Sequence, residues 1–323
     1  MQRIEKLILS TNFPIGPVNA YLLFGEKLTL IDTGLNTNQA WQELNEGLHG
    51  LGLTLNDIEQ IVLTHHHNDH TGLLHRILDK HPTIAVHAHK DTQVFLNNKD
   101  YLAWSTIFFE KLFYKFGLPK DLIEKWASRT RSQHLLHNLK IDQALQEGDR
   151  IPGLPDWQVI ETLGHSQDHI SLYCPDEQIF ICGDHIIKDA YGGLFFDAPL
   201  LGNKRAKPLL QYVEDLEKCR NISAKITYSG HGPDIDHLNA AIDAHILNIE
   251  KRTQRVINTL EKLNGVATGY EIIQDMYRGR LQTAIVSFIF EIIGVLDLLE
   301  EQNIVQSEKI NGIYRYYLRE NSL

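Results

Sequence analysis

Residues 62–70 read VLTHHHNDH, a short apolar run followed directly by four histidines and an aspartate. The apolar run has the composition of a buried strand, and in an extended segment side chains two positions apart point the same way. His65 and His67 can therefore bind one metal ion, while Asp69 and His70, at the start of a following helix, turn toward a second. Imidazole and carboxylate groups suit zinc, iron or manganese.

This cluster gives at most four ligands, so a two-metal site needs donors from elsewhere in the chain. Three further polar residues each end a strand-like run and stand next to a glycine. They are His165 in residues 159–166 (VIETLGHS), Asp184 in residues 179–184 (IFICGD) and His231 in residues 229–232 (SGHG). Glycine allows other groups to approach the backbone closely, so these three residues are candidate metal ligands.

The order HxHxDH, then Gly-His, Gly-Asp and Gly-His-Gly, resembles the metallo-β-lactamase-fold hydrolases of the glyoxalase II-like kind. Residues 30–34 (LIDTG) match an early strand and turn of that family, and the resemblance covers about residues 4–250. It implies an αββα sandwich. The ligands it implies are His65, His67 and His165 for one ion, Asp69, His70 and His231 for the second, and Asp184 as the bridge. Leu163 stands where a proline is common before the Gly-His pair.

Two adjacent cations would lower the pKa of a shared water molecule, so a metal-bridging hydroxide could attack a carbonyl or phosphoryl centre near neutral pH. The same ions would stabilise the oxyanion that develops. We expect two divalent metal ions, with zinc preferred and iron or manganese as alternatives. Asp69 is the candidate catalytic residue, because a carboxylate beside that hydroxide could pass a proton to the leaving group.

Two residues are expected to support the ligands. Asp32, in the LIDTG turn, resembles a family residue that accepts a hydrogen bond from a metal-bound imidazole; a simple turn residue is the alternative. His169 lies about one helical turn after His165, which favours an orienting role over direct ligation. His66 lies on the opposite side of the alternating segment and is expected to face the neighbouring layer or solvent.

Three residues are candidates for the substrate pocket. Tyr191 follows Asp184 and could polarise a substrate carbonyl, as a tyrosine does in similar lactonases; a loop tyrosine is the alternative. Trp104 and Phe108 belong to an aromatic helix expected over residues 101–116. They could line a hydrophobic substrate channel, since insertions in this fold tend to lie near the mouth of the site, or they could form packed core.

Short β-branched runs alternate with helical periodicity in the first third of the chain, which favours a layered α/β fold. Two helices expected over residues 101–131 interrupt this pattern, so residues 99–135 are interpreted as a helical insertion. From residue 251 the pattern changes to three helices and two short strands in a winged-helix-like order. We therefore expect a hydrolase domain at residues 1–250 and a small C-terminal domain at residues 251–323.

The composition limits the class of protein. The 323 residues carry a formal net charge of −10, which repels polyanions and argues against nucleic acid as a partner. Three cysteines without CxxC spacing indicate neither a disulfide framework nor a thiolate zinc site. The chain opens without a leader pattern, and the apolar run 283–299 holds acidic residues and is too short to span a bilayer. We therefore expect a cytoplasmic protein without a membrane anchor.

The aromatic insertion and the acidic charge favour a small ester, thioester or lactone as substrate. One alternative is an RNA or phosphodiester nuclease, since some similar hydrolases with a winged-helix-like C-terminal segment cleave RNA. Another is a metal-bearing protein that binds a ligand without turning it over, and iron would also permit a redox role. Residues 251–323 contain as many basic as acidic residues, so we interpret them as a packing or dimer-forming module, and a homodimer is a further expectation.

Overall fold

The computed structural model describes residues 3–97, 99–131, 139–188, 196–200, 204–278 and 281–319. The chain divides into two compact units. The first unit comprises Met1–Asn97, His137–Gly192 and Glu214–Ala244, and the second comprises Asn98–Leu136, Gly193–Val213 and His245–Leu323. The residues of the helical insertion thus group with the C-terminal segment. The domain boundary expected at residue 250 stays a prediction, because compactness does not test independent folding.

The first unit contains two β-sheets. The first sheet has the order β1-β2-β3-β4-β5-β6, and its strands are antiparallel as far as β3 and parallel beyond it. These strands are β1 (Arg3–Leu9), β2 (Val18–Phe24), β3 (Leu28–Ile31), β4 (Gln60–Val62), β5 (Ala85–His89) and β6 (Gln143–Leu145). The second sheet has the order β11-β10-β9-β8-β7, with β10 and β11 parallel and the other pairs antiparallel. Its strands are β7 (Arg150–Ile151), β8 (Leu154–Glu161), β9 (Ile170–Cys174), β10 (Ile179–Gly183) and β11 (Ile226–Ser229).

The central strands of the first sheet are buried on both faces. Leu30 and Ile61 belong to one apolar cluster, whereas their neighbours Ile31 and Val62 belong to another that also contains Trp157 of the second sheet. Successive side chains of a strand point to opposite faces, so β3 and β4 are mostly apolar, with Thr29 and Gln60 as buried polar exceptions. The sequences of both strands consist mostly of apolar residues for that reason.

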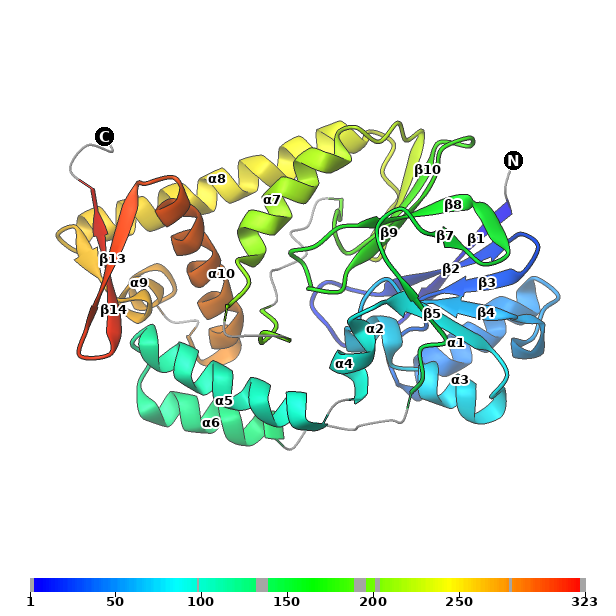
Figure 1. Ribbon diagram of the computed structural model, residues 1–323, viewed down its shortest axis with the longest axis horizontal. Helices are drawn as coiled ribbons and strands as arrows, with labels where there is room; N and C mark the ends of the chain where they lie inside the picture. Colours follow the sequence, from blue (N-terminus) through cyan, green and yellow to red (C-terminus); the bar gives the residue numbers. More distant parts are fainter. Residues whose placement is uncertain are drawn as a thin grey trace. The chain divides into compact units, whose positions relative to one another are not determined.

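Helices cover the face of the first sheet that lies away from the second sheet. Leu44 and Leu48 of α1 (Asn38–Gly50) and Ile77 of α3 (Leu74–Lys80) are fully buried in the apolar cluster that contains Leu30 and Ile61. Figure 1 shows α1 and α3 on one side of the first sheet and β7–β10 on the other. The remaining helical elements before residue 98 are η1 (Leu55–Asp57), α2 (Asn68–Thr71) and α4 (Thr92–Asn97). The expected layered α/β fold is confirmed.

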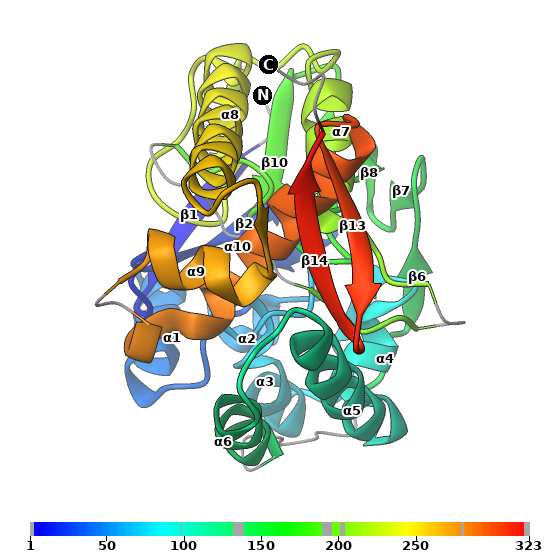
Figure 2. The same ribbon diagram turned by 90° about the vertical axis from the view of Figure 1, so that its left-hand side faces the viewer.

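The second unit combines helices with a three-stranded sheet in the order β12-β14-β13, whose β13–β14 hairpin Figure 2 shows. The insertion forms the two expected helices, α5 (Lys99–Lys115) and α6 (Lys120–Arg131). The later elements are α7 (Pro208–Cys219), α8 (Leu238–Lys262), β12 (Val266–Ala267), α9 (Gly269–Met276), α10 (Leu281–Glu301), β13 (Val305–Ile310) and β14 (Ile313–Leu318). Helices α7 and α8 each contain residues of both units. The winged-helix-like assignment stays a prediction.

Aromatic rings form the core of the second unit. The rings of Phe109 and Phe290 lie 5.6 Å apart, and those of Phe113 and Trp126 lie 4.9 Å apart. Helix α10 contributes Phe290 and further buried apolar side chains, so the apolar run near residue 290 is a buried helix, as expected. Among the described residues, no helix combines the length and the apolar character needed to cross a bilayer.

Candidate metal centre

The candidate ligands all follow the carboxyl ends of strands in the first unit. Four of them come after β4, and the other three come after β8, β10 and β11. The structure brings together His65, His67, Asp69, His70, His165, Asp184 and His231, and every one except His67 is buried. Their roles as ligands stay predictions, but their positions are the ones that a shared centre requires.

Three imidazole nitrogens converge in the first group. His67 Nδ1 lies 2.9 Å from His65 Nε2 and 3.0 Å from His165 Nε2. Burial, together with the neighbouring imidazoles, holds the pKa values of His65 and His67 well below the usual range. Both rings are therefore neutral, and a cation could accept a lone pair from each of the three nitrogens.

Asp69, His70 and His231 form the second group. His231 Nε2 lies 3.3 Å from Asp69 Oδ2, and His70 Nε2 lies 4.0 Å from the same oxygen. Burial would lower the pKa of His231, but the nearby carboxylates of Asp184 and Asp69 outweigh it and raise that pKa to about 9. Burial also opposes protonation of His70, whose pKa is nevertheless raised well above the usual value by the surrounding carboxylates.

Asp184 lies between the two groups. Its Oδ1 is 3.3 Å from His70 Nε2, and its Oδ2 is 3.4 Å from His231 Nε2 and 3.6 Å from His165 Nε2. Burial would raise the pKa of Asp184, but the charges of His70 and His231 lower it well below the usual range. The carboxylate is thus ionised and faces one member of the first group and two of the second.

The seven residues fit divalent metal ions. His70 Nε2, Asp184 Oδ1 and His231 Nε2 are buried and have no hydrogen-bond partner among the described residues. Buried polar atoms are normally hydrogen-bonded, and these three nevertheless crowd together at ion-pair distances. A cation between them would satisfy all three, and a set of imidazoles and carboxylates is one that divalent metals bind.

Asp32 connects the two groups. Its Oδ2 accepts hydrogen bonds from His70 Nδ1 and from the Thr64 hydroxyl, both at 2.7 Å, and its Oδ1 accepts one from the Thr64 N–H at 2.8 Å. The Thr64 hydroxyl therefore accepts from His65 Nδ1, which lies 2.9 Å away. In their neutral forms His65 and His70 thus carry the proton on Nδ1 and direct the Nε2 lone pair to the centre.

Backbone acceptors orient the last histidine of the second group. The Pro17 carbonyl accepts a hydrogen bond from His231 Nδ1 at 2.8 Å. Asn19 Nδ2 donates to the carbonyls of Ser229 and Gly232, both at 2.9 Å, and so holds the turn that carries His231. The sequence analysis missed Thr64, Pro17 and Asn19. The one available signal was a buried asparagine inside the apolar run of β2.

His169 contacts the backbone of Asp184. The Asp184 N–H donates to His169 Nε2 at 3.1 Å, so the ring proton lies on Nδ1 and is donated to the Thr162 hydroxyl 2.8 Å away. Burial, and secondarily the charge of His165, lowers the pKa of His169 to about 3. A neutral His169 thus positions the start of the segment that carries Asp184.

Two glycines allow the strand ends to approach. A Cβ at Gly183, whose φ is +49°, would lie 2.7 Å from His169 Nε2. A Cβ at Gly230 would lie 2.1 Å from Asp184 Oδ1 and 2.9 Å from His70 Cε1. The Gly230 N–H also donates to the Gly183 carbonyl at 2.7 Å. Gly183 and Gly230 are thus needed for this close packing.

The remaining residues singled out from the sequence lie in different surroundings. His66 stacks on Phe95, and its Nδ1 lies 2.8 Å from the buried Asp168 carboxylate. Tyr191 lies outside the described residues. Trp104 and Phe108 belong to the second unit, where their rings are 5.9 Å apart and both line a cavity. Their assignment to the substrate pocket stays a prediction.

Comparison with known proteins identifies relatives along the whole chain. A sequence model of the Metallo-beta-lactamase superfamily matches residues 14–231. The chain is 32% identical over 299 residues to "Probable metallo-hydrolase YqjP" of Bacillus subtilis (strain 168), and the match covers 92% of both chains. It is 26% identical over 288 residues to "Beta-lactamase-like protein 2 homolog" of Caenorhabditis elegans, and that match covers 86% of this chain and 79% of the other. The crystal structure of a metallo-beta-lactamase family protein from Thermus thermophilus superposes with a TM-score of 0.76 and 25% identity over 98% of both chains.

Proposed function

Because the chain belongs to the metallo-beta-lactamase superfamily and is a hydrolase of that fold, we propose that it hydrolyses a small ester, thioester or lactone with two divalent metal ions. The proposal rests on one observation above all. The Asp184 carboxylate lies within 3.6 Å of imidazole nitrogens from both ligand groups. A carboxylate shared in this way is what a pair of adjacent cations would need.

His65, His67 and His165 would hold one ion, and Asp69, His70 and His231 the other. Zinc is the preferred metal, with iron and manganese as alternatives, because the described donors are nitrogen and oxygen atoms without a thiolate. When bound, a pair of divalent ions supplies Lewis acidity that lowers the pKa of water and stabilises negative charge on the substrate oxygen. Asp32, Thr64 and the Pro17 carbonyl keep the imidazoles aligned.

Asp69 is the residue we propose for proton transfer. Its carboxylate is buried, and although burial opposes it, the charges of His70 and His231 lower its pKa. The ionised Oδ2 can accept a proton and return it to the leaving group. Asp69→Ala should then lower turnover by about 10²–10⁴-fold, the range for general acid–base groups. The measurement is steady-state kinetics on protein whose metal content matches wild type, and unchanged turnover would remove the role.

The substrate class is tested with a panel. We would assay a p-nitrophenyl ester, a thioester, a lactone, bis-p-nitrophenyl phosphate and RNA against zinc-, manganese- and iron-loaded protein. The acidic net charge of −10 disfavours polyanions, so a carbonyl substrate should exceed the phosphodiesters in kcat/KM by at least about tenfold, or about 1.4 kcal/mol.

Two variants test whether the activity depends on the candidate metal centre. Asp184→Asn should abolish the best activity, and Asp142→Asn should retain it, because Asp142 directly precedes β6 and its carboxylate accepts a hydrogen bond from the Val86 N–H of β5. A preference for RNA or phosphodiester would replace the proposal with a nuclease. Failure of fully metallated protein on every substrate would leave a metal-bearing ligand-binding protein.

The remaining expectations complete the proposal. We propose a winged-helix-like C-terminal module that mediates homodimer formation, supported by the exposed apolar side chain of Ile310 at the end of β13. Sedimentation equilibrium tests it, and a monomeric mass would reject it. The three cysteines are free and buried, which is in keeping with the proposed cytoplasmic location.

A further inference from the structure

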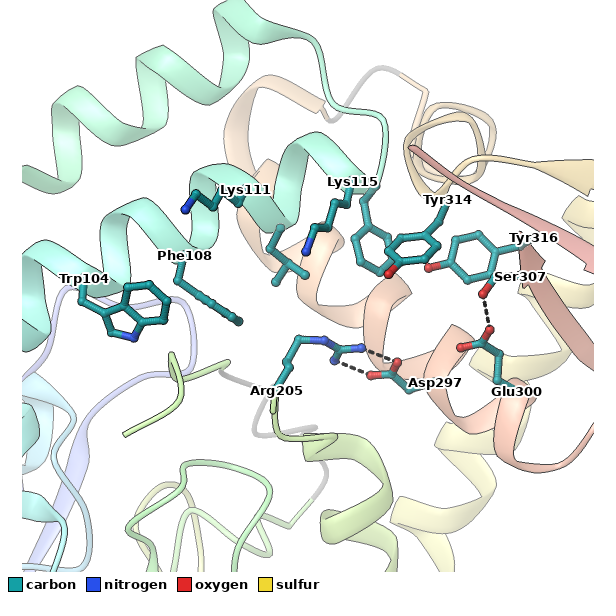
Figure 3. A pocket seen from close by; sticks show the side chains of 12 residues that line it. Trp104, Phe108, Lys111, Lys115, Arg205, Asp297, Glu300, Ser307, Tyr314 and Tyr316 are labelled. Carbon is teal, nitrogen blue, oxygen red and sulfur yellow. Dashed lines mark hydrogen bonds and ion pairs between the residues drawn. The ribbon is translucent and has the colours of Figure 1, made fainter. Parts of the chain in front are cut away.

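A cavity of about 370 Å³ lies within the second unit, bounded by α5, α10 and the β13–β14 hairpin. Small-molecule sites begin at roughly 300 Å³, so the space is adequate for a ligand of one or two rings. Figure 3 shows side chains from α5 and from β14 extending toward the same space as Arg205. The polar and aromatic lining decides which ligand would fit.

Aromatic rings form two walls of this cavity. Trp104 and Phe108 lie on successive turns of α5, with ring centroids 5.9 Å apart. Phe116 stacks on Tyr316 at 5.8 Å and lies 6.2 Å from Tyr314. Tyr314 and Tyr316 are two positions apart on β14 and therefore share a face of the hairpin. Such walls favour a flat aromatic body.

Two ammonium groups on α5 add positive charge. Lys111 and Lys115 are spaced four residues apart on the helix, so they are neighbours on its surface. Within the described part of the chain, neither ammonium group has a carboxylate at ion-pair distance. Like charges at this spacing destabilise a helix, and an anion bound between them would remove that repulsion.

The opposite side of the cavity carries one ion pair and one further carboxylate. Arg205 donates two hydrogen bonds to the buried carboxylate of Asp297, at 2.5 and 2.6 Å. Glu300 accepts a hydrogen bond from the Ser307 hydroxyl at 2.5 Å. A hydroxyl leaves the charge of Glu300 in place, so the lining holds three cationic and two anionic side chains and keeps a net positive charge, and its two cations that lack a carboxylate partner among the described residues lie on α5.

The Tyr316 hydroxyl is a further polar group without a partner. The residue is only 3% exposed, and its ring extends from β14 toward the cavity, yet its hydroxyl makes no hydrogen bond to any described residue. Tyr316 lines the cavity, so its hydroxyl is accessible from that space. A ligand in the cavity would supply the missing partner.

We propose that this cavity binds a small aromatic anion, a molecule with a flat ring system and one carboxylate or phosphate group. The ring system would lie against the aromatic walls, and the anionic group would pair with Lys111 and Lys115. The Tyr316 hydroxyl would form the remaining hydrogen bond to the ligand. This site is additional to the metal centre, whose ligands all belong to the first unit.

Isothermal titration calorimetry of the full-length, metal-loaded protein tests the proposal. The probes are naphthoate and naphthyl phosphate, which carry the two anionic groups, naphthol, which is uncharged, and inorganic phosphate, which lacks a ring. We expect one of the two aromatic anions to bind at least about tenfold more tightly than naphthol and inorganic phosphate, a difference of about 1.4 kcal/mol. The tighter of the two identifies the preferred anionic group.

Variants locate the binding. Replacing both lysines, Lys111→Gln with Lys115→Gln, removes both charges while keeping polar side chains, and should weaken the preferred anion about tenfold, a difference of about 1.4 kcal/mol. Lys120→Gln is the matched control, because Lys120 pairs with Glu124 on the neighbouring helix and does not line the cavity. An unchanged affinity in the double variant, equal binding of naphthol, or no binding of either aromatic anion would overturn the proposal.

Discussion

Asp32 controls the orientation of a histidine in each ligand group. Its carboxylate accepts a hydrogen bond from His70 directly, and it is linked to His65 through the hydroxyl of Thr64. The residue adopts φ = 58°, a left-handed conformation that aspartate tolerates better than most side chains. The backbone geometry of the LIDTG turn and the alignment of the metal ligands therefore depend on the same side chain.

Asp32→Asn should weaken metal binding about 10–100-fold, the usual effect of removing a hydrogen-bond partner of a ligand histidine. Asparagine preserves the size and the turn conformation but carries no charge. Competition against a chromogenic chelator measures the affinity, and Asp142→Asn is the control. Equal affinities for the Asp32 variant and wild type would contradict the orienting role.

His87 makes a separate contribution to stability. It is 4% exposed, and neither ring nitrogen has a hydrogen-bond partner among the described residues. Burial, with the charge of Lys27, lowers its pKa against the opposing charge of Asp142. At pH values below the unfolded pKa of about 6.5, the unfolded chain binds a proton at this position that the folded protein does not.

The free energy of unfolding should therefore fall as the pH drops below about 6.5, with a contribution from His87 of at most about 1.4 kcal/mol per pH unit. His87→Gln removes that contribution, so the difference in stability between wild type and variant should shrink or reverse between neutral and acid pH. Urea unfolding of metal-loaded proteins at several pH values measures this. A pH-independent difference would show that His87 is protonated equally in both states.

At the scale of elements, the centre is built where strand ends converge, and glycine makes that convergence sterically feasible. The turns after β10 and β11 lie in contact because Gly183 and Gly230 lack side chains. A methyl group at either position would displace a ligand or the residue that orients it.

Gly230→Ala should therefore reduce metal binding severely, because its Cβ would overlap Asp184 Oδ1 at 2.1 Å. Gly232→Ala is the matched control: that glycine has φ = +72°, but a Cβ there meets no atom within 4 Å. The control should lose about 1 kcal/mol of stability through backbone strain and keep its metal. Metal analysis by mass spectrometry separates the two, and full occupancy in Gly230→Ala would refute the steric argument.

The elements that could be predicted are those with a local pattern. Apolar periodicity indicated α5, α6 and α10, and the strand before His65 was indicated by its β-branched run. Strand β12 was missed because two residues carry no period, and its pairing with β14 is made across a long stretch of chain. The candidate ligands could be predicted because histidine and aspartate are typical metal ligands. The orienting role of the Pro17 carbonyl could not be predicted, because every residue has a carbonyl group.

At the scale of the whole molecule, the division of the chain into two compact units could not be predicted from the sequence. The insertion near residue 100 groups with a segment that begins near residue 245, and this depends on packing between distant aromatic residues such as Phe113 and Phe290. The candidate metal ligands, in contrast, all belong to the first unit, so metal binding and the stability of the two units can be measured separately.

Removal of metal should destabilise the first unit selectively. Ligand binding to the folded state alone adds about 2.7 kcal/mol at a concentration of 100 Kd, and chelation removes this contribution. Hydrogen exchange with and without a chelator should show faster exchange near residues 183–184 and 229–232, with residues 266–318 unchanged. Restoring zinc is the control. Equal acceleration in both units, or none, would contradict the assignment of the ions to the first unit.

The spacing of the donors along the chain has a consequence for biosynthesis. Synthesis proceeds from the N-terminus, and the first ligand group is complete only once residue 165 has emerged, whereas the second needs His231, whose turn is held by Asn19 of β2. A nascent or truncated chain that ends before residue 231 therefore lacks a complete pair of sites. Completion of the second ligand group therefore waits until the N-terminal strands have found a partner more than 200 residues downstream.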